Sequence, residues 1–149
     1  MREAVIQLVT AFVGSLGFAL LFGMRRRHLF YASLGGLVSW GIYLGVLELS
    51  GNVFFSCLLA SMFAMVYSEQ MARFRKCPAT LFIIIAIIPL VPGSSLYYFM
   101  SYAVLGEMET SASYGHQTVI WVLAIAAGIS FVTAIHELRS KRNQNPKIS

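Results

Sequence analysis

Long runs of apolar residues, separated by short polar connections, make up most of the chain. Five runs are long enough to cross a hydrocarbon core of roughly 30 Å as helices, which takes about 20 residues. They occupy residues 4–23, 29–49, 53–72, 79–105 and 118–135. No strand-like alternation is visible, and unpaired backbone groups are costly in lipid. The pattern therefore predicts an all-α integral membrane protein with five transmembrane helices.

The polar connections differ in charge, and this difference predicts an orientation. Arginine and lysine cluster at 25–28, at 73–76 and in the tail from residue 139, whereas 48–52 and 106–117 contain neither. With five spans, all three basic clusters fall on one side, which the positive-inside rule makes cytoplasmic. We therefore expect the N-terminus outside and the C-terminus in the cytoplasm. Among the basic residues, only Arg2 does not fit this distribution.

The domain organisation follows from the same pattern. We expect a single transmembrane helical domain over residues 1–138 and a basic cytoplasmic tail over residues 139–149. The first apolar run is long enough to span, and it ends in three arginines instead of a small-residue cleavage site. It is therefore expected to be retained as the first span and not removed as a signal peptide.

Composition supports a membrane protein and argues against other classes. Only 11% of the residues are charged, against about 25% in a typical soluble domain, and the chain contains no aspartate. The net charge of +5 comes from short clusters and not from a basic soluble surface, which argues against nucleic-acid binding.

Candidate catalytic and metal-binding residues are few. Neither the cysteines nor the histidines have metal-ligand spacing, and no hydrolase, P-loop or dinucleotide motif occurs. The residues concerned are Cys57, Cys77, His28, His116 and His136. We expect no enzymatic activity, no metal and no cofactor.

The fourth run contains an interruption, PLVPG, at residues 89–93. Pro89 and Pro92 each remove a backbone donor and clash with the preceding turn, at about 3 kcal/mol or more in a helix interior. The interruption begins about ten residues, or roughly 15 Å, from the cytoplasmic end of the run, which places it near the bilayer midplane. The fourth helix is therefore predicted to be discontinuous at Pro89–Gly93, with both prolines holding the break open.

The second half of the broken helix is a candidate substrate site. Pro92 suits the first helical position, so the amides of Gly93, Ser94 and Ser95 would point into the bundle at the positive end of a helix dipole. Such an end binds carboxylates, and transporters place substrate sites at discontinuous helices. Tyr97 follows one turn later and would line the site. The alternative is a structural proline kink whose free groups are satisfied by neighbouring helices and water.

Glu69 is the ionisable residue of most interest within a span. A carboxylate inside a membrane is by default a functional candidate, here for proton coupling. Glu69 and Arg73 also stand at positions i and i+4 in the order that favours an ion pair on a helix. We favour the ion pair and keep proton coupling as the alternative.

Small residues recur at four-residue spacing in three of the runs. Such stripes let helix backbones approach closely and mark helix–helix contacts, either within the chain or with a partner. The predicted contact residues are Gly41, Gly45, Ala60, Ala64, Ala124 and Gly128.

Four segments together resemble the threonine/serine exporter family. They are GFALLF (17–22), SE with AR (68–69 and 72–73), KCPAT (76–80) and above all IPLVPGSSLY (88–97). The similarity is to the C-terminal half of the fused exporter, in the form that exists as a separate small subunit. It extends over all five spans.

The resemblance implies a secondary exporter of small amino acids (threonine or serine) or small carboxylates such as succinate, in the cell inner membrane. It also implies a partner, a larger subunit carrying the N-terminal half, and self-association is a further option. This chain matches only one half of the fused exporter, so the resemblance does not imply that it transports alone. Two rival hypotheses stay open: a non-transporting assembly subunit and a small channel.

Overall fold

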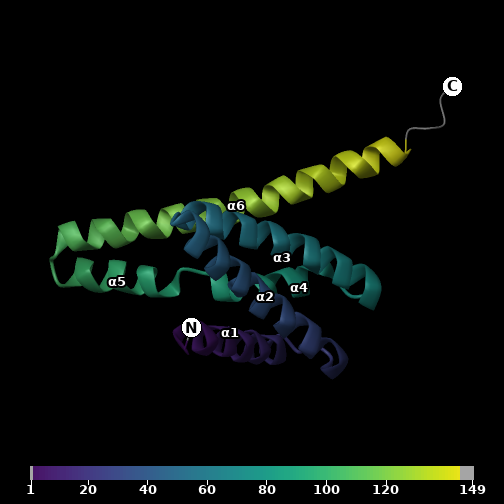
Figure 1. Cartoon of the computed structure of the whole chain (residues 1–149), viewed down its shortest axis with the longest axis horizontal. Helices are drawn as coiled ribbons and strands as arrows, with labels where there is room; N and C mark the ends of the chain where they lie inside the picture. Colours follow the sequence, from purple (N-terminus) through teal and green to yellow (C-terminus); the bar gives the residue numbers. More distant parts are fainter. Residues whose placement is uncertain (1, 145–149) are drawn as a thin grey trace.

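The computed structural model describes residues 2–144 and consists, over that range, of helices joined by short turns (Figure 1). No strand occurs in this part of the chain, so the all-α prediction is confirmed. The elements are α1 (Arg2–Leu21), α2 (Arg26–Ser50), α3 (Val53–Arg75), α4 (Ala79–Ile87), the 3₁₀ helix η1 (Ile88–Leu90), α5 (Gly93–Val104) and α6 (Met108–Gln144).

These helices supply four or five candidate membrane spans. Four are individually long and apolar enough to cross a membrane: α1, α2, α3 and the Met108–Arg139 part of α6. The remaining span is a pair of helical pieces, Ala79–Leu90 and Gly93–Val104, bent by 57° at the break between them. The predicted discontinuity of the fourth run is therefore confirmed, and the chain is a multi-pass membrane protein with four candidate spans, or five if the bent pair crosses the membrane as one.

The turn between α2 and α3 shows how local sequence sets the helix ends. Gly51 adopts a left-handed backbone (φ 62°) and donates its N–H to Leu47 O at 2.9 Å, which terminates α2. Asn52 then caps α3 by accepting a hydrogen bond from the Phe54 N–H at 2.9 Å. A tight helical hairpin follows because the stop and start signals are adjacent.

The start of α6 differs from the expected arrangement. Residues 106–117 were predicted to be a connection, but α6 already begins at Met108, so only a short turn remains. The first turns of α6 pack against α5: the Ser111 hydroxyl donates to Phe99 O at 2.8 Å, and Gly115 lies beside the Phe99 ring. These tertiary contacts, absent from a hydropathy pattern, explain why a polar segment is helical.

The far end of α6 passes the predicted boundary between span and tail. The helix continues to Gln144 without a break at residue 138, while residues 145–149 lie outside the described part of the chain. The first part of the predicted tail is thus an extension of the last helix.

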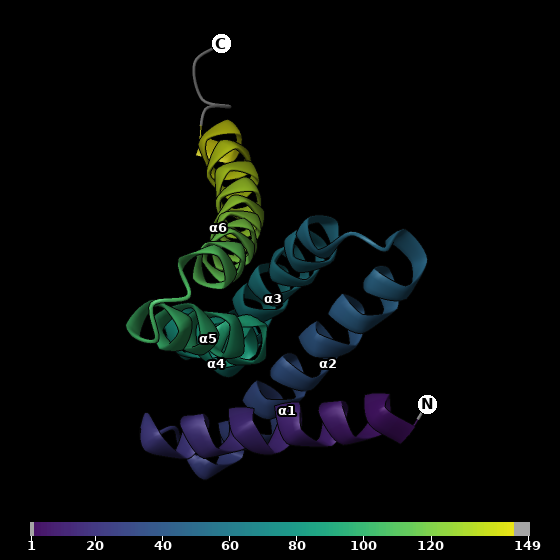
Figure 2. The same cartoon turned by 90° about the vertical axis from the view of Figure 1, so that its left-hand side faces the viewer.

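Small side chains hold the bundle together. Ala60, Ala64 and Ala124 are fully buried, which brings α3 close to its neighbours, including α6. Most buried serines are accommodated because their hydroxyls bond within their own helix, as Ser39 does with Gly35 O at 2.8 Å. The buried Ser15 hydroxyl instead donates to Ile85 O of α4 at 3.4 Å. Figure 2 shows α1 on one side of the molecule and α6 on the other, with α2, α3 and α4 between them.

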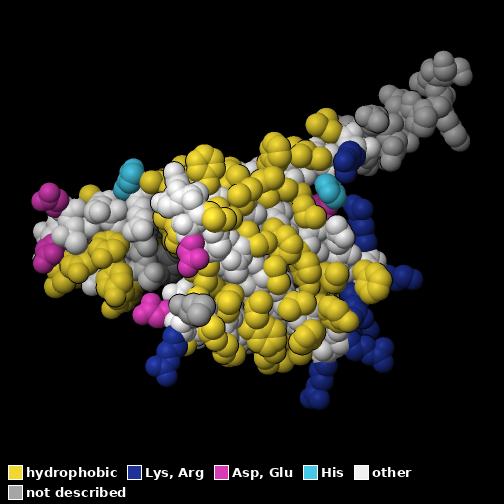
Figure 3. All heavy atoms as spheres, in the orientation of Figure 1, with side chains coloured by type: hydrophobic (Ala, Val, Ile, Leu, Met, Phe, Trp, Pro, Cys, Tyr) yellow, Lys and Arg dark blue, Asp and Glu magenta, His cyan; other side chains and the backbone are white. Residues whose placement is uncertain are grey.

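Charge is distributed unevenly along the molecule. Most Lys and Arg side chains visible in Figure 3 gather at one end, and most of the visible glutamate side chains lie toward the opposite end. The basic end is where α2 begins at Arg26 and α3 ends at Arg75. The apolar surface between the two ends is the part suited to the lipid interior.

Candidate functional site

The broken helix has a defined backbone path. After η1, Val91 is extended (φ −64°, ψ 126°), Pro92 follows with φ −76° and ψ 56°, and α5 begins at Gly93. Leu90 is fully buried in a cluster with Tyr43 and the α3 core, and Pro92 is also buried. The break is therefore anchored on both sides. Pro92 was expected to be the first helical residue, but it stands one position earlier, as the N-cap of α5.

The start of α5 presents two amides without partners. The Gly93 N–H, expected to be free, donates to Val91 O at 2.8 Å. The first bond of the new helix runs from the Leu96 N–H to Pro92 O at 3.0 Å. Within residues 2–144, neither the amides nor the hydroxyls of Ser94 and Ser95 have a hydrogen-bond partner. These donors stand at the positive end of α5.

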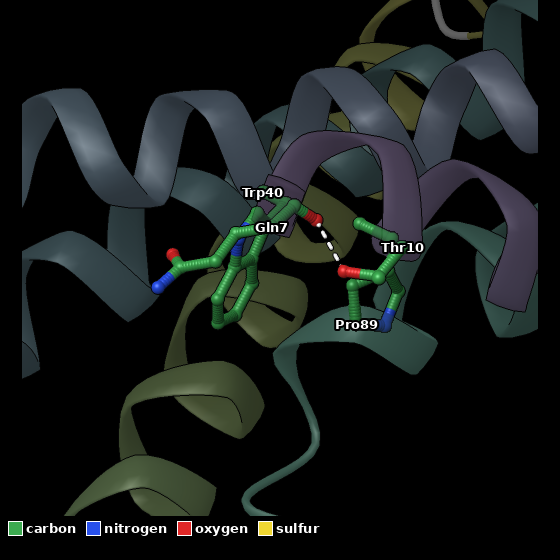
Figure 4. A pocket seen from close by; sticks show the side chains of 5 residues that line it. Gln7, Thr10, Trp40 and Pro89 are labelled. Atoms are coloured by element: carbon green, nitrogen blue, oxygen red, sulfur yellow. Dashed lines mark hydrogen bonds between the residues drawn. The ribbon is translucent and has the colours of Figure 1, made fainter. Parts of the chain in front are cut away.

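A cavity of about 240 Å³ adjoins the break (Figure 4). It is formed between α1, α2 and η1, and it is lined by Gln7, Thr10, Ala11, Trp40 and Pro89. The Thr10 hydroxyl donates to the Gln7 carbonyl at 2.9 Å, whereas the Trp40 Nε1–H is buried without a partner. The cavity thus combines apolar walls with the Gln7 side-chain amide, and the unsatisfied Trp40 N–H is buried in its wall.

The predicted site residues are only partly brought together. Pro89 alone among them lines the cavity, while Gly93 and Ser94 are exposed at the start of α5. Tyr97 is 68% exposed and lines a separate hollow of about 390 Å³ with residues 100, 101, 104 and 105 of the same helix and turn. Tyr97 therefore faces away from the cavity and toward the surface of the chain.

The cavity residues from α1 and α2 were not predicted. Gln7 and Thr10 are polar positions three apart in the first apolar run, which is a weak signal for a face that does not contact lipid. Trp40 gives no signal of its own, because an aromatic residue in a span is ordinary. Its role depends on how α1 and α2 pack against the break.

Glu69 lies at the interface of α3 and α6, near the basic end. Its carboxylate contacts the His136 imidazole and lies 3.9 Å from Arg73 Nη2, with the Glu69 side chain 15% exposed. The Arg73 guanidinium is also 3.4 Å from His136 Nδ1. The interaction with Arg73 is present, but His136, on another helix, is the nearer partner.

The predicted small-residue positions differ in their surroundings. A Cβ added at Gly128 would lie 2.7 Å from Leu58 O, so α3 and α6 are in backbone contact there. Gly41 lies beside Leu8 of α1, whereas Gly45 has open space around it. Gly36, which was not predicted, is more tightly packed than Gly41 or Gly45, because a Cβ there would lie 2.9 Å from Ser15 Cβ.

A multi-pass helical chain with a helix pair bent at a break is an arrangement found in many secondary transporters. The sequence model of the protein family described as "Threonine/Serine exporter, ThrE" matches residues 7–135. The chain therefore belongs to the threonine/serine exporter family, a family of membrane transporters, as its motifs had suggested. No solved structure matches the chain.

Proposed function

We propose that this chain is one subunit of a secondary exporter of threonine and serine, or of small carboxylates such as succinate, in the cell inner membrane. Family membership supports export of hydroxy amino acids. All of these substrates carry a carboxylate, and the broken helix offers donors suited to that group. The observation that carries the proposal is the pair of unpartnered amides at Ser94 and Ser95.

The carboxylate is proposed to bind at the start of α5. Two backbone N–H groups and two serine hydroxyls would donate to its oxygens, and the dipole of α5 adds to the attraction. Gly93 leaves this approach open, since a Cβ built there would meet no atom within 4 Å. The cavity beside Pro89, with Gln7 and Trp40, would then receive the remainder of the substrate.

A partner chain is proposed to complete the site. Among the described elements, α5 packs substantially against α6 alone, and none of its residues is buried. The start of α5 is therefore uncovered in the isolated chain, and Tyr97 faces whatever covers it. A larger subunit carrying the N-terminal half of the exporter would provide this cover, and a second copy of the chain is the alternative.

The proposed orientation places the N-terminus outside and the basic end in the cytoplasm. The gathering of Lys and Arg at one end of the molecule supports it through the positive-inside rule (Figure 3). The cargo would accordingly approach from the end that carries the basic clusters.

Gly93→Leu tests the proposed site. The leucine fits without a clash inside the chain, so the protein should fold normally, but its side chain would obstruct the two serine amides. Export of labelled threonine, serine or succinate from cells, measured with the partner subunit coexpressed, should fall at least about ten-fold, the effect of losing one or two charge-assisted hydrogen bonds.

Gly14→Leu is the matched control, because Gly14 also has no atom within 4 Å of an added Cβ but lies on α1. Normal export by Gly93→Leu would refute the site and favour the assembly-subunit hypothesis. Substrate flux that increases linearly with substrate concentration, without saturation and without coupling to the gradient of a second solute, would favour a channel.

A further inference from the structure

A second hollow lies at the basic end of the molecule, apart from the broken helix. It has a volume of about 630 Å³ and brings together the start of α2 and the end of α3. Its lining residues are Arg25, Arg26, Arg27, His28, Phe74, Arg75 and Lys76. Two segments far apart in the sequence thus place five permanently charged residues around one concave surface.

These charges have no counter-charge within the described part of the chain. The lining contains no carboxylate. The ion pairs formed among the described residues involve Glu69 with Arg73 and His136, none of which is one of the five cations. Like charges held close together repel one another, so an anion in the hollow would lower the energy of this arrangement.

Two buried nitrogen atoms in the hollow also lack partners. The His28 side chain is only 8% exposed, and its Nδ1 makes no hydrogen bond. The Nε of Arg75 is likewise buried and unpaired. A buried polar group without a partner costs about 1–3 kcal/mol, and more when it is charged. Both atoms belong to residues that line the hollow, so their unmet hydrogen-bonding capacity lies beside the place where a ligand would sit.

Arg75 is held in place by its surroundings. Its guanidinium lies over the Tyr31 ring, with Cζ 3.9 Å from the ring centroid. The Tyr31 backbone is itself fixed, because its carbonyl accepts a hydrogen bond from the Tyr67 hydroxyl at 2.8 Å. The N-terminus of α2 opens on the same hollow without a side-chain cap, which adds the positive end of a long helix.

We propose that this hollow binds a phosphate group. Arginine forks match tetrahedral oxyanions, and several cations converge here with two unsatisfied nitrogen atoms. The phosphate could come from an anionic lipid headgroup, since basic pockets at the ends of membrane helices are suited to such headgroups, or from a soluble phosphate. The site is independent of the proposed export function.

The test uses the full chain purified in an uncharged detergent. Its thermal unfolding midpoint is measured with inorganic phosphate, phosphatidylglycerol or phosphatidylcholine, at ionic strength held constant with chloride. Phosphate or phosphatidylglycerol should raise the midpoint above the chloride and phosphatidylcholine values. Arg75→Gln should weaken the apparent affinity about ten-fold, the effect of losing one charge-assisted hydrogen bond.

Two further variants keep the test decisive. Arg26→Gln removes an exposed cation of the hollow without disturbing the fold, and it should also weaken binding. Arg2→Gln removes one positive charge outside the hollow and should leave binding unchanged. A response to phosphatidylglycerol alone identifies a lipid headgroup, and a response to inorganic phosphate identifies a soluble source. No response beyond that to chloride, or an equal loss in Arg2→Gln, would overturn the proposal.

Discussion

The bundle of α1–α4 and the arm formed by α5 with the start of α6 are built on opposite plans. In the bundle, alanine, serine and glycine bring backbones together, and most buried hydroxyls bond inside their own helices. In the arm, no residue of α5 is buried, and α5 is attached mainly to α6 (Figure 1). Large apolar and aromatic side chains therefore cover the surface of the arm instead of a core.

The arm is nevertheless ordered by its own contacts. Tyr98 and Tyr102 of α5 lie against Tyr114 of α6, with ring centroids 5.3 Å and 5.7 Å apart. Such aromatic pairs contribute about 0.5–1.5 kcal/mol each beyond the area they bury. The difference between the regions indicates that the bundle is complete within the chain, whereas the arm is a preformed surface for lipid or for another protein.

The largest effect is expected where the bundle meets α6, from Gly128→Leu. A Cβ there already meets Leu58 O at 2.7 Å, and this neighbour is backbone that cannot swing aside. Overpacking of this kind costs about 1–3 kcal/mol or more, and here α3 and α6 must separate. We expect a strongly reduced yield of monodisperse protein in detergent and a lowered unfolding midpoint, measured by size-exclusion chromatography and thermal melting.

Gly17→Leu provides the control for this variant, because an added Cβ at Gly17 meets nothing within 4 Å. Equal stability of the two variants would mean that the bundle is not held by close backbone contact, and the contrast with the arm would then be lost.

The break was predictable because its causes are local. Two prolines and a glycine within five residues remove backbone donors wherever the segment lies. The composition of the cavity was not predictable, because Gln7 and Trp40 reach Pro89 only through the way α1 and α2 cross the break. The free amide expected at Gly93 was also wrong, since that N–H bonds to Val91 O within the turn.

The start of α6 shows what a hydropathy pattern cannot predict. A hydropathy pattern detects segments that suit lipid, and residues 108–117 are too polar to register. Their helix is stabilised by contacts with α5, such as the hydrogen bond from Ser111 to Phe99 O. Similarly, Glu69 and Arg73 were expected to pair from their spacing alone, whereas the contact with His136 depends on how α3 and α6 align.

An intermediate effect is expected from Glu69→Gln, at the interface that joins the bundle to α6. Losing the charged contact with His136 and Arg73 should cost about 1 kcal/mol, less than in a dry interior because both partners are partly exposed. Thermal melting should show a drop of a few degrees. If Glu69 also couples export to protons, Glu69→Gln should remove the dependence of export on a pH gradient in proteoliposomes.

Arg73→Gln separates these two roles, because it weakens the ion pair and leaves the carboxylate in place. Dependence on the gradient that survives in Glu69→Gln would leave the residue with a structural role only.

The smallest effect on the chain itself is expected in the arm, from Val104→Ser. Val104 is 89% exposed, so its replacement should change the stability of the isolated protein by no more than about 0.5 kcal/mol. If the arm is covered by a partner, the same change should reduce copurification of that partner. Leu49→Ser, at an equally exposed position (90%) at the end of α2, is the control and should not do so. A hydroxyl at position 104 would weaken a packed contact with a protein, whereas lipid chains can rearrange around it. Equal recovery of the partner with both variants would therefore show that lipid, and not protein, covers the arm.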